Sequence, residues 1–216
     1  MKTIEFYFDV VSPYSWLAFH RIHTALPSAN WNYRSIPVLF ARLLDHHKKL
    51  GPAEIPEKRR YVFKDVIRIA HRLQKKFVGP PSHPFNPLLP LRVICATPER
   101  DRNEVGFSLI DGAWGKGIDI STEQGVRAAL EHLGLDLDAI LSNSLSEQTK
   151  QILKQNTETA INKGVDGVPT FFVEHEMFFG QDRFEDVLYC AEGRLKVDES
   201  FVNEVLSRPS SAIRKT

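Results

Sequence analysis

The chain has 216 residues, with 28 lysines and arginines against 27 aspartates and glutamates, which gives a formal net charge of +1. This balance does not indicate nucleic-acid binding, and charged residues interrupt every apolar run before it could span a membrane. With 42% hydrophobic residues, the chain can bury a substantial core. Its start lacks the layout of a secretory signal, and Cys95 and Cys190 form no CxxC pair. We therefore expect a cytoplasmic protein in which both cysteines are reduced and buried.

The first unit of the chain is predicted to be a strand, a helix and a strand. Ile4, Phe6 and Phe8 alternate with polar residues, which indicates a strand over about 2–10. Ser12-Pro13 then fits a helix cap followed by proline at the first helical position, and apolar residues recur at helical spacing to about residue 26. A second strand is predicted over about 31–38. Because one helix joins the two strands, they should be parallel.

From about residue 40 to residue 165, strand signals nearly disappear and helices are predicted. The strongest helix runs from Glu57 to Phe77, with an apolar stripe on one side and lysines and arginines on the rest. We interpret its basic side chains as a solvated face, whose first turn could supply a cation for an anionic substrate. The loop from Gly79 to Pro87 is too rich in proline to be helical. Further helices are predicted at about 40–50, 88–98, 100–115, 122–133, 137–143 and 145–163.

After Gly167 the pattern returns to strands. Thr170–Val173 and Met177–Phe179 indicate a hairpin, Asp182 is expected to cap a final helix, and a loose polar tail is expected from about Arg208. The resulting order is β-α-β, a helical block, and β-β-α. Since neither β piece has enough strands to be stable alone, the two should form one sheet. We predict an α/β protein in which residues 1–40 and 165–208 form one domain and residues 41–164 form a helical insertion.

This order of elements, with Ser12-Pro13 early and Val168-Pro169 before the third strand, resembles the thioredoxin fold with the helical insertion of its DsbA-like branch. The disulfide oxidoreductases of that branch carry Cys-Pro-x-Cys where this chain has Ser12-Pro-Tyr-Ser15, without either sulfur. Three stretches are similar to kappa-class glutathione transferases and to their bacterial relatives, the 2-hydroxychromene-2-carboxylate isomerases. The resemblance spans nearly the whole chain and is weakest in the middle. The three stretches are residues 8–15, 167–172 and 179–183.

The resemblance implies a glutathione site. Ser12, which by itself is an ordinary helix cap, would donate a hydrogen bond to the glutathione thiolate, whose pKa a helix N-terminus lowers from about 8.5. Pro169 would follow a cis peptide bond, and the backbone of Val168 would hold the cysteine-containing ligand. Asp182 would bind the α-amino group of the γ-glutamyl unit, with Arg183 beside it. Without the resemblance, these two residues would be interpreted as a capping aspartate and a surface arginine.

Two further features bear on the site. Asn86, in His83-Pro-Phe-Asn-Pro87, fits a family pattern at the substrate pocket. The ligand-binding asparagine that many family members carry in a Gly-Asn-x-Pro segment has no counterpart in Leu50–Pro56, so that contact does not transfer. The spacing of the histidine pairs does not indicate a metal site. These pairs are His20 with His23 and His46 with His47.

The resemblance implies a homodimeric enzyme that acts on a small aromatic carboxylate. It would interconvert 2-hydroxychromene-2-carboxylate and trans-o-hydroxybenzylidenepyruvate through a reversible adduct of the glutathione thiolate. Two alternatives stay open. One is a transferase that conjugates glutathione to small electrophiles, which net consumption of glutathione would reveal. The other is a module that binds glutathione or an aromatic acid without turnover.

Overall fold

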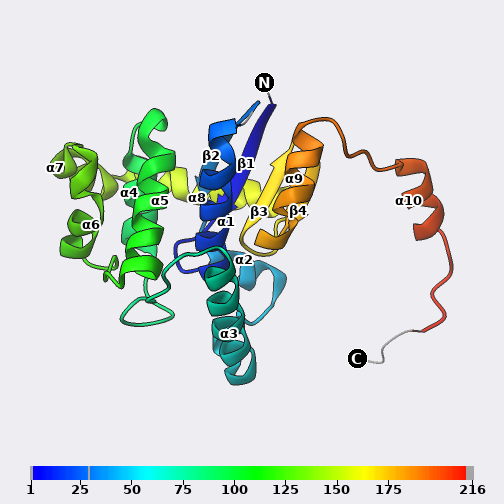
Figure 1. The fold of residues 1–216 in the computed structure, drawn as a ribbon, viewed down its shortest axis with the longest axis horizontal. Helices are drawn as coiled ribbons and strands as arrows, with labels where there is room; N and C mark the ends of the chain where they lie inside the picture. Colours follow the sequence, from blue (N-terminus) through cyan, green and yellow to red (C-terminus); the bar gives the residue numbers. More distant parts are fainter. Residues whose placement is uncertain (1, 29, 213–216) are drawn as a thin grey trace.

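A four-stranded mixed sheet stands at the centre of the computed structural model, which describes residues 2–28 and 30–212 (Figure 1). The strands lie in the order β2-β1-β3-β4. β1 is parallel to β2 and antiparallel to β3, which pairs with β4 as a hairpin. The expectation that the two β pieces share one sheet is therefore confirmed. The bounds are β1 (Lys2–Phe8), β2 (Trp31–Pro37), β3 (Thr170–Val173) and β4 (Glu176–Phe179).

Helices cover both faces of the sheet. In Figure 1, α1 and α9 lie in front of it, α8 passes behind it, and α3 extends below it. The bounds are α1 (Pro13–Ala25), α2 (Phe40–His47), α3 (Pro56–Arg72), α4 (Leu88–Ala96), α5 (Glu99–Lys116), α6 (Glu123–Leu130), α7 (Leu137–Ser144), α8 (Glu147–Asn162), α9 (Phe184–Ala191) and α10 (Glu199–Leu206). Short 3-10 turns lie at Leu26–Ser28 (η1), Pro52–Glu54 (η2), Glu131–Leu133 (η3) and Gln181–Arg183 (η4).

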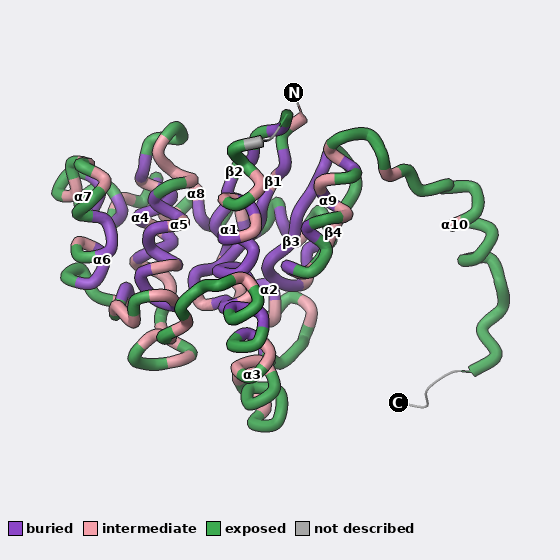
Figure 2. The backbone as a smooth tube through the Cα atoms, viewed as in Figure 1, coloured by how far each residue is buried: buried purple, intermediate pink, exposed green. Residues whose placement is uncertain are grey.

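The alternation in β1 sorts its side chains onto the two faces. Phe6 and Phe8 enter the main core, where Phe6 stacks on Phe171 of β3 with ring centroids 5.0 Å apart. Tyr7 faces the other way and belongs to a second cluster with Leu43 of α2 and Ala160 of α8. Both clusters are buried, and Figure 2 shows the buried backbone concentrated in β1, β3 and α1. The sheet is thus covered on both faces, which fixes the position of the loop that leaves β1.

Helix α5 packs against the sheet and is hydrogen-bonded to the loop that follows β1. Gly106 lets α5 approach the sheet closely, because a Cβ there would lie 3.2 Å from the ring of Phe8. Further along α5, the buried Trp114 donates its indole N–H to the carbonyl of Val10 at 2.9 Å. Trp16 of α1 donates to Asp111 of α5 at 3.0 Å. The main core runs without interruption from the sheet into these helices.

The structure corrects two expectations and adds one helix. Helix α3 ends at Arg72 rather than Phe77, because the chain turns away through a left-handed residue at Gln74. Asp182 does not cap α9, which has no side-chain cap; it lies in η4 and pairs with Arg183. Helix α10 has no counterpart among the predicted helices; it is exposed along most of its length and lies apart from the body in Figure 1.

The cysteine expectation is confirmed, because Cys95 and Cys190 are both free and buried. Within residues 2–28 and 30–212, none of the helices has the length and apolar character needed to cross a membrane.

Candidate active site

Ser12 caps the N-terminus of α1. After β1 the chain turns, with the Ser12 N–H donating to the carbonyl of Asp9 at 3.1 Å. The Ser12 hydroxyl accepts a hydrogen bond from the Ser15 N–H at 3.2 Å, and Pro13 contributes no N–H to the first turn. Among the described residues, this leaves the Tyr14 N–H as the amide of that turn without an acceptor. The positive end of the helix dipole therefore lies at Ser12 and Tyr14.

The segment around Pro169 lies against this helix end. The Val168–Pro169 peptide bond is cis, as expected. The Ser12 hydroxyl donates to the carbonyl of Val168 at 3.4 Å, across 156 positions of sequence. The carbonyl of Pro169 in turn accepts from the Gly180 N–H at 2.9 Å, which ties this loop to the end of β4. The two segments singled out in the sequence, around Ser12 and around Pro169, are thus in contact.

A cavity of about 400 Å³ opens beside Ser12 and Val168. Its walls come from α2, from the segment around η2, from the first turns of α3 and from the loop before α4. Most of these side chains are apolar, so the cavity suits a small hydrophobic ligand with a few polar groups. The apolar wall includes Phe40, Ala41, Leu44, Leu50, Val62, Phe63, Phe85 and Pro87.

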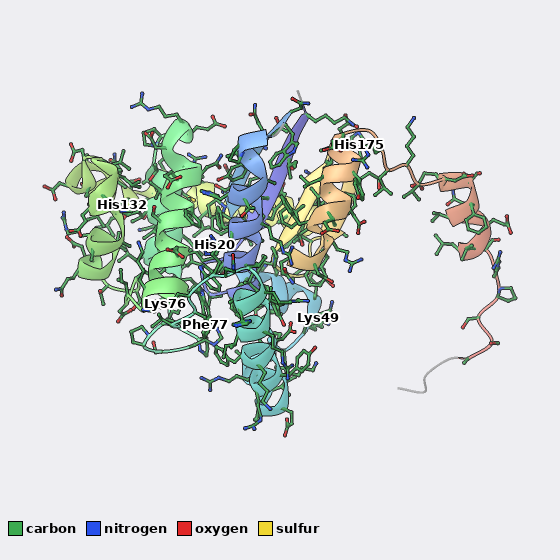
Figure 3. The ribbon with its side chains drawn as sticks, in the orientation of Figure 1. His20, Lys49, Lys76, Phe77, His132 and His175 are labelled. Carbon is green, nitrogen blue, oxygen red and sulfur yellow. The ribbon has the colours of Figure 1, made fainter. Side chains whose placement is uncertain are left out.

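Two cationic side chains border the cavity, and they differ in their partners. Lys49, labelled in Figure 3 beside α3, forms an ion pair with Asp166. Arg59 donates to the carbonyl of His83 at 2.8 Å, and its guanidinium carbon lies 5.9 Å from the centroid of the Phe63 ring. Within the part of the chain that the structure describes, Arg59 has no acidic partner. Arg59 is therefore the cavity cation that is free to meet an anionic ligand.

Three titratable groups in the cavity wall did not stand out in the sequence. Burial lowers the pKa of His83, whose Nε2 lies 3.1 Å from the carbonyl of Val11. Burial raises the pKa of the Tyr14 hydroxyl, and its 2.9 Å hydrogen bond to Asp65 raises it further. Burial also raises the pKa of Asp9 to about 7. A charged residue directly after an apolar strand and three positions before Ser12 was the signal that could have identified Asp9.

Comparison with known proteins places this chain in a family. The model of the DSBA-like thioredoxin domain matches residues 3–190. The chain belongs to the DSBA-like thioredoxin domain family. It is 29% identical over 204 residues to glutathione S-transferase kappa 2 of Caenorhabditis elegans, covering 86% of this chain and 90% of that protein. It is 26% identical over 190 residues to a 2-hydroxychromene-2-carboxylate isomerase of Sphingobium xenophagum, covering 85% of this chain and 95% of that protein.

A solved structure of a 2-hydroxychromene-2-carboxylate isomerase superposes with a TM-score of 0.81 at 26% identity, covering 95% of this chain and all of that one. The expected DsbA-like thioredoxin fold is therefore confirmed, as is the resemblance to these isomerases and to kappa-class glutathione transferases. The DsbA-like domain of this chain carries Ser12 and Ser15 at the start of α1, and neither can form a disulfide.

Among the described residues, the other predicted site residues Asp182, Arg183 and Asn86 do not line the cavity. Asp182 and Arg183 lie in η4, which Arg21 ties to α1 by a 2.7 Å hydrogen bond to Gln181. The side chain of Asp182 is 61% exposed and pairs with Arg183 at 2.9 Å. Asn86 is exposed, and its side-chain oxygen accepts from the Leu88 N–H at 3.0 Å. Among the described residues, Phe85 and Pro87 line the cavity. Asn86, which lies between them in the sequence, does not.

The histidines do not gather into one cluster. Figure 3 shows His20 on α1, His132 at the far left and His175 at the hairpin turn. Among the described residues, no group of three or more histidine, cysteine, aspartate or glutamate side chains is arranged to hold a metal ion.

Proposed function

We propose that this protein is a glutathione-dependent enzyme in which Ser12 stabilises the ionised thiol of bound glutathione. The observation that carries the proposal is the position of the Ser12 hydroxyl, at the positive end of α1, against the carbonyl of Val168 and beside an apolar cavity. Such a helix end lowers the pKa of a thiol. The names of the relatives, kappa-class glutathione transferases and 2-hydroxychromene-2-carboxylate isomerases, support the same proposal.

The residues present fit glutathione along one side of α1. The backbone of Val168 would hold the cysteine unit, and Ser12 would hold its sulfur. Asp182 would bind the α-amino group of the γ-glutamyl unit, and Arg183 would lie beside its carboxylate. This placement is consistent with η4 packing against α1 through Arg21 and Gln181. Bound glutathione supplies a thiolate that can add reversibly to a conjugated double bond.

The chain's own groups perform four tasks in this proposal. The Ser12 hydroxyl and the Tyr14 N–H donate hydrogen bonds where negative charge develops. The apolar wall excludes water from the reacting atoms. Arg59 binds the carboxylate of the substrate at the cavity mouth. Asn86 contacts the substrate from the edge of the cavity.

The specific reaction that we propose is the interconversion of 2-hydroxychromene-2-carboxylate and trans-o-hydroxybenzylidenepyruvate, a step of aromatic catabolism. This proposal is supported by Arg59, which has no acidic partner among the described residues, at the mouth of a small apolar cavity.

We also propose that the enzyme is a cytoplasmic homodimer, for which sedimentation and cell fractionation are the tests. Two buried free cysteines fit a reducing compartment.

A second candidate reaction is conjugation of glutathione to small electrophiles, which the 29% identity to a named glutathione transferase favours. The two reactions differ in stoichiometry. Purified protein should be incubated with glutathione and 2-hydroxychromene-2-carboxylate, and both free thiol and product should be measured over time. Product formation at constant thiol supports the isomerase, while loss of one thiol per product supports the transferase. Absence of any glutathione-dependent turnover of this substrate or of a panel of electrophiles would refute both.

A further inference from the structure

Asp9 is the most deeply buried acidic side chain at the candidate site. It has no solvent-exposed surface, yet it bounds the floor of the cavity and precedes Ser12 by three positions. One carboxyl oxygen accepts from the Val11 N–H at 3.0 Å and the other from the Phe40 N–H at 2.8 Å. Phe40 begins α2, which has no side-chain cap from its own N-cap residue. Asp9 therefore ties the loop that carries Ser12 to the helix that forms one cavity wall.

No positive side chain compensates the charge of this carboxyl in the described part of the chain, because Asp9 takes part in no ion pair there. The other titratable and charged groups that line the cavity have partners elsewhere or lie exposed at its mouth. Lys49 pairs with Asp166, Glu54 accepts from the Gly51 N–H, Tyr14 donates to Asp65, His83 contacts Val11, Arg59 donates to His83, and Asp45 is exposed.

The turn from Asp9 to Ser12 brings the two residues close together. Its closing hydrogen bond from the Ser12 N–H to the Asp9 carbonyl is that of a β-turn, in which the first and last Cα atoms lie within about 7 Å. A thiolate at Ser12 and an ionised Asp9 would thus place two negative charges in one poorly solvated region. Because little solvent screens charges in such a region, the repulsion of the pair raises one of the two pKa values.

We infer that Asp9 takes up a proton when a glutathione thiol bound at Ser12 ionises. The S–H bond of the thiol breaks and an O–H bond forms on Asp9, so the cavity floor carries one negative charge before and after ionisation. This inference rests on the proposed function, and it gives Asp9 a part in thiol activation that hydrogen bonding alone would not. The free protein is suited to it, because burial raises the pKa of Asp9 to about 7.

The test is an infrared difference spectrum of the whole protein at pH 8, with and without glutathione. This pH lies above the pKa of about 7, so the Asp9 carboxyl of the free protein is mostly ionised. Glutathione is expected to produce the carbonyl band of a protonated carboxyl. S-methylglutathione, which has the same carboxyls but no thiol proton, should not produce it. The band should disappear in Asp9→Asn and persist in Asp45→Asn, a matched change at an exposed carboxylate in the same cavity.

The outcomes separate this inference from the proposed function. If ultraviolet absorbance shows bound thiolate while no carboxyl band appears, the inference is overturned and the proposed function stands. If glutathione does not bind, or binds without ionising, both are overturned. A band that persists in Asp9→Asn would assign the proton to another group and would also overturn the inference.

A second measurement, the unfolding equilibrium as a function of pH, needs no ligand. It also shows whether Asp9→Asn folds, because a variant that does not fold has no unfolding transition. The pKa of a carboxyl in an unfolded chain is about 3.9, below the value of about 7 for folded Asp9. Between these values the folded state holds a proton that the unfolded state has lost, so stability falls as pH rises from about 4 to 7. The unfolding equilibrium constant of the wild type should rise by up to tenfold per pH unit relative to Asp9→Asn. Parallel pH profiles would show that Asp9 does not hold this proton.

Discussion

Replacing Ser12 by alanine should lower turnover far more than it weakens glutathione binding. In the proposed complex, the tripeptide is held mainly by the backbone of Val168 and by η4. The substitution removes the 3.4 Å hydrogen bond from Ser12 to the Val168 carbonyl but changes neither of these two segments. The hydroxyl acts chiefly when the sulfur is negative. Loss of a hydrogen bond to a charged group costs about 1.5–3 kcal/mol, which corresponds to an increase of about one to two units in the pKa of the bound thiol.

This pKa increase sets the size and the pH dependence of the effect. While the thiol stays largely protonated, the thiolate population and the rate should fall about ten- to a hundredfold near neutral pH. The loss should shrink as the pH approaches the new pKa of the thiol. Some activity should remain, because the helix dipole and the Tyr14 N–H persist in Ser12→Ala.

The assay is an ultraviolet titration of the thiolate of bound glutathione in the wild type and in Ser12→Ala. Ser146→Ala is the matched control, because Ser146 caps α8 by accepting from the Thr149 N–H at 3.2 Å but lies outside the cavity. Both variants should lose about 0.5–2 kcal/mol of stability through the lost cap, and only Ser12→Ala should shift the titration. Identical titrations in wild type and Ser12→Ala would reduce Ser12 to a helix cap and refute the reasoning.

Three further predictions concern residues around the cavity. Asp182→Ala should weaken glutathione binding by at most about fivefold, since an exposed ion pair contributes about 0.2–1 kcal/mol; unchanged affinity in calorimetry would remove Asp182 from the site. Arg59→Ala should raise the KM for a carboxylate substrate about two- to fivefold but not that for its neutral amide, with Arg60→Ala as the control on the same helix; equal effects on both substrates would contradict the assignment. The protein should not reduce insulin disulfides, because Ser12 and Ser15 cannot form a mixed disulfide; reduction at thioredoxin-like rates would refute this.

Much of the fold was predictable because local patterns and topology agree in it. The alternation of Ile4, Phe6 and Phe8 survives in β1 because one face of the sheet is a continuous apolar core. The Ser12-Pro13 start of α1 is predictable because cap and first-turn preferences are local. The contact between Ser12 and Val168 was inferred from the resemblance of two distant motifs, since no local pattern specifies a contact across 156 positions.

The parts that were missed depend on tertiary packing. Helical spacing alone does not show which apolar residues of α3 are covered: Ile67 is 49% exposed, while Ile69 is 4% exposed because that side of the helix packs on the body. The cavity wall could not be assembled from sequence, since it combines α2, α3 and a proline-rich loop. The first turn of the basic helix was expected to supply a cation, and the partners of Arg59 single it out there. Asp9 becomes a candidate through its burial, which a charge pattern does not show.

The central claim, that glutathione binds with its sulfur at Ser12, is tested most directly by a crystal structure of the protein with glutathione. The account predicts the sulfur within hydrogen-bond distance of the Ser12 hydroxyl, the cysteine backbone paired with Val168, and the γ-glutamyl end directed toward η4. A structure in which the sulfur lies away from Ser12, or in which the site stays empty at saturating glutathione, would contradict it.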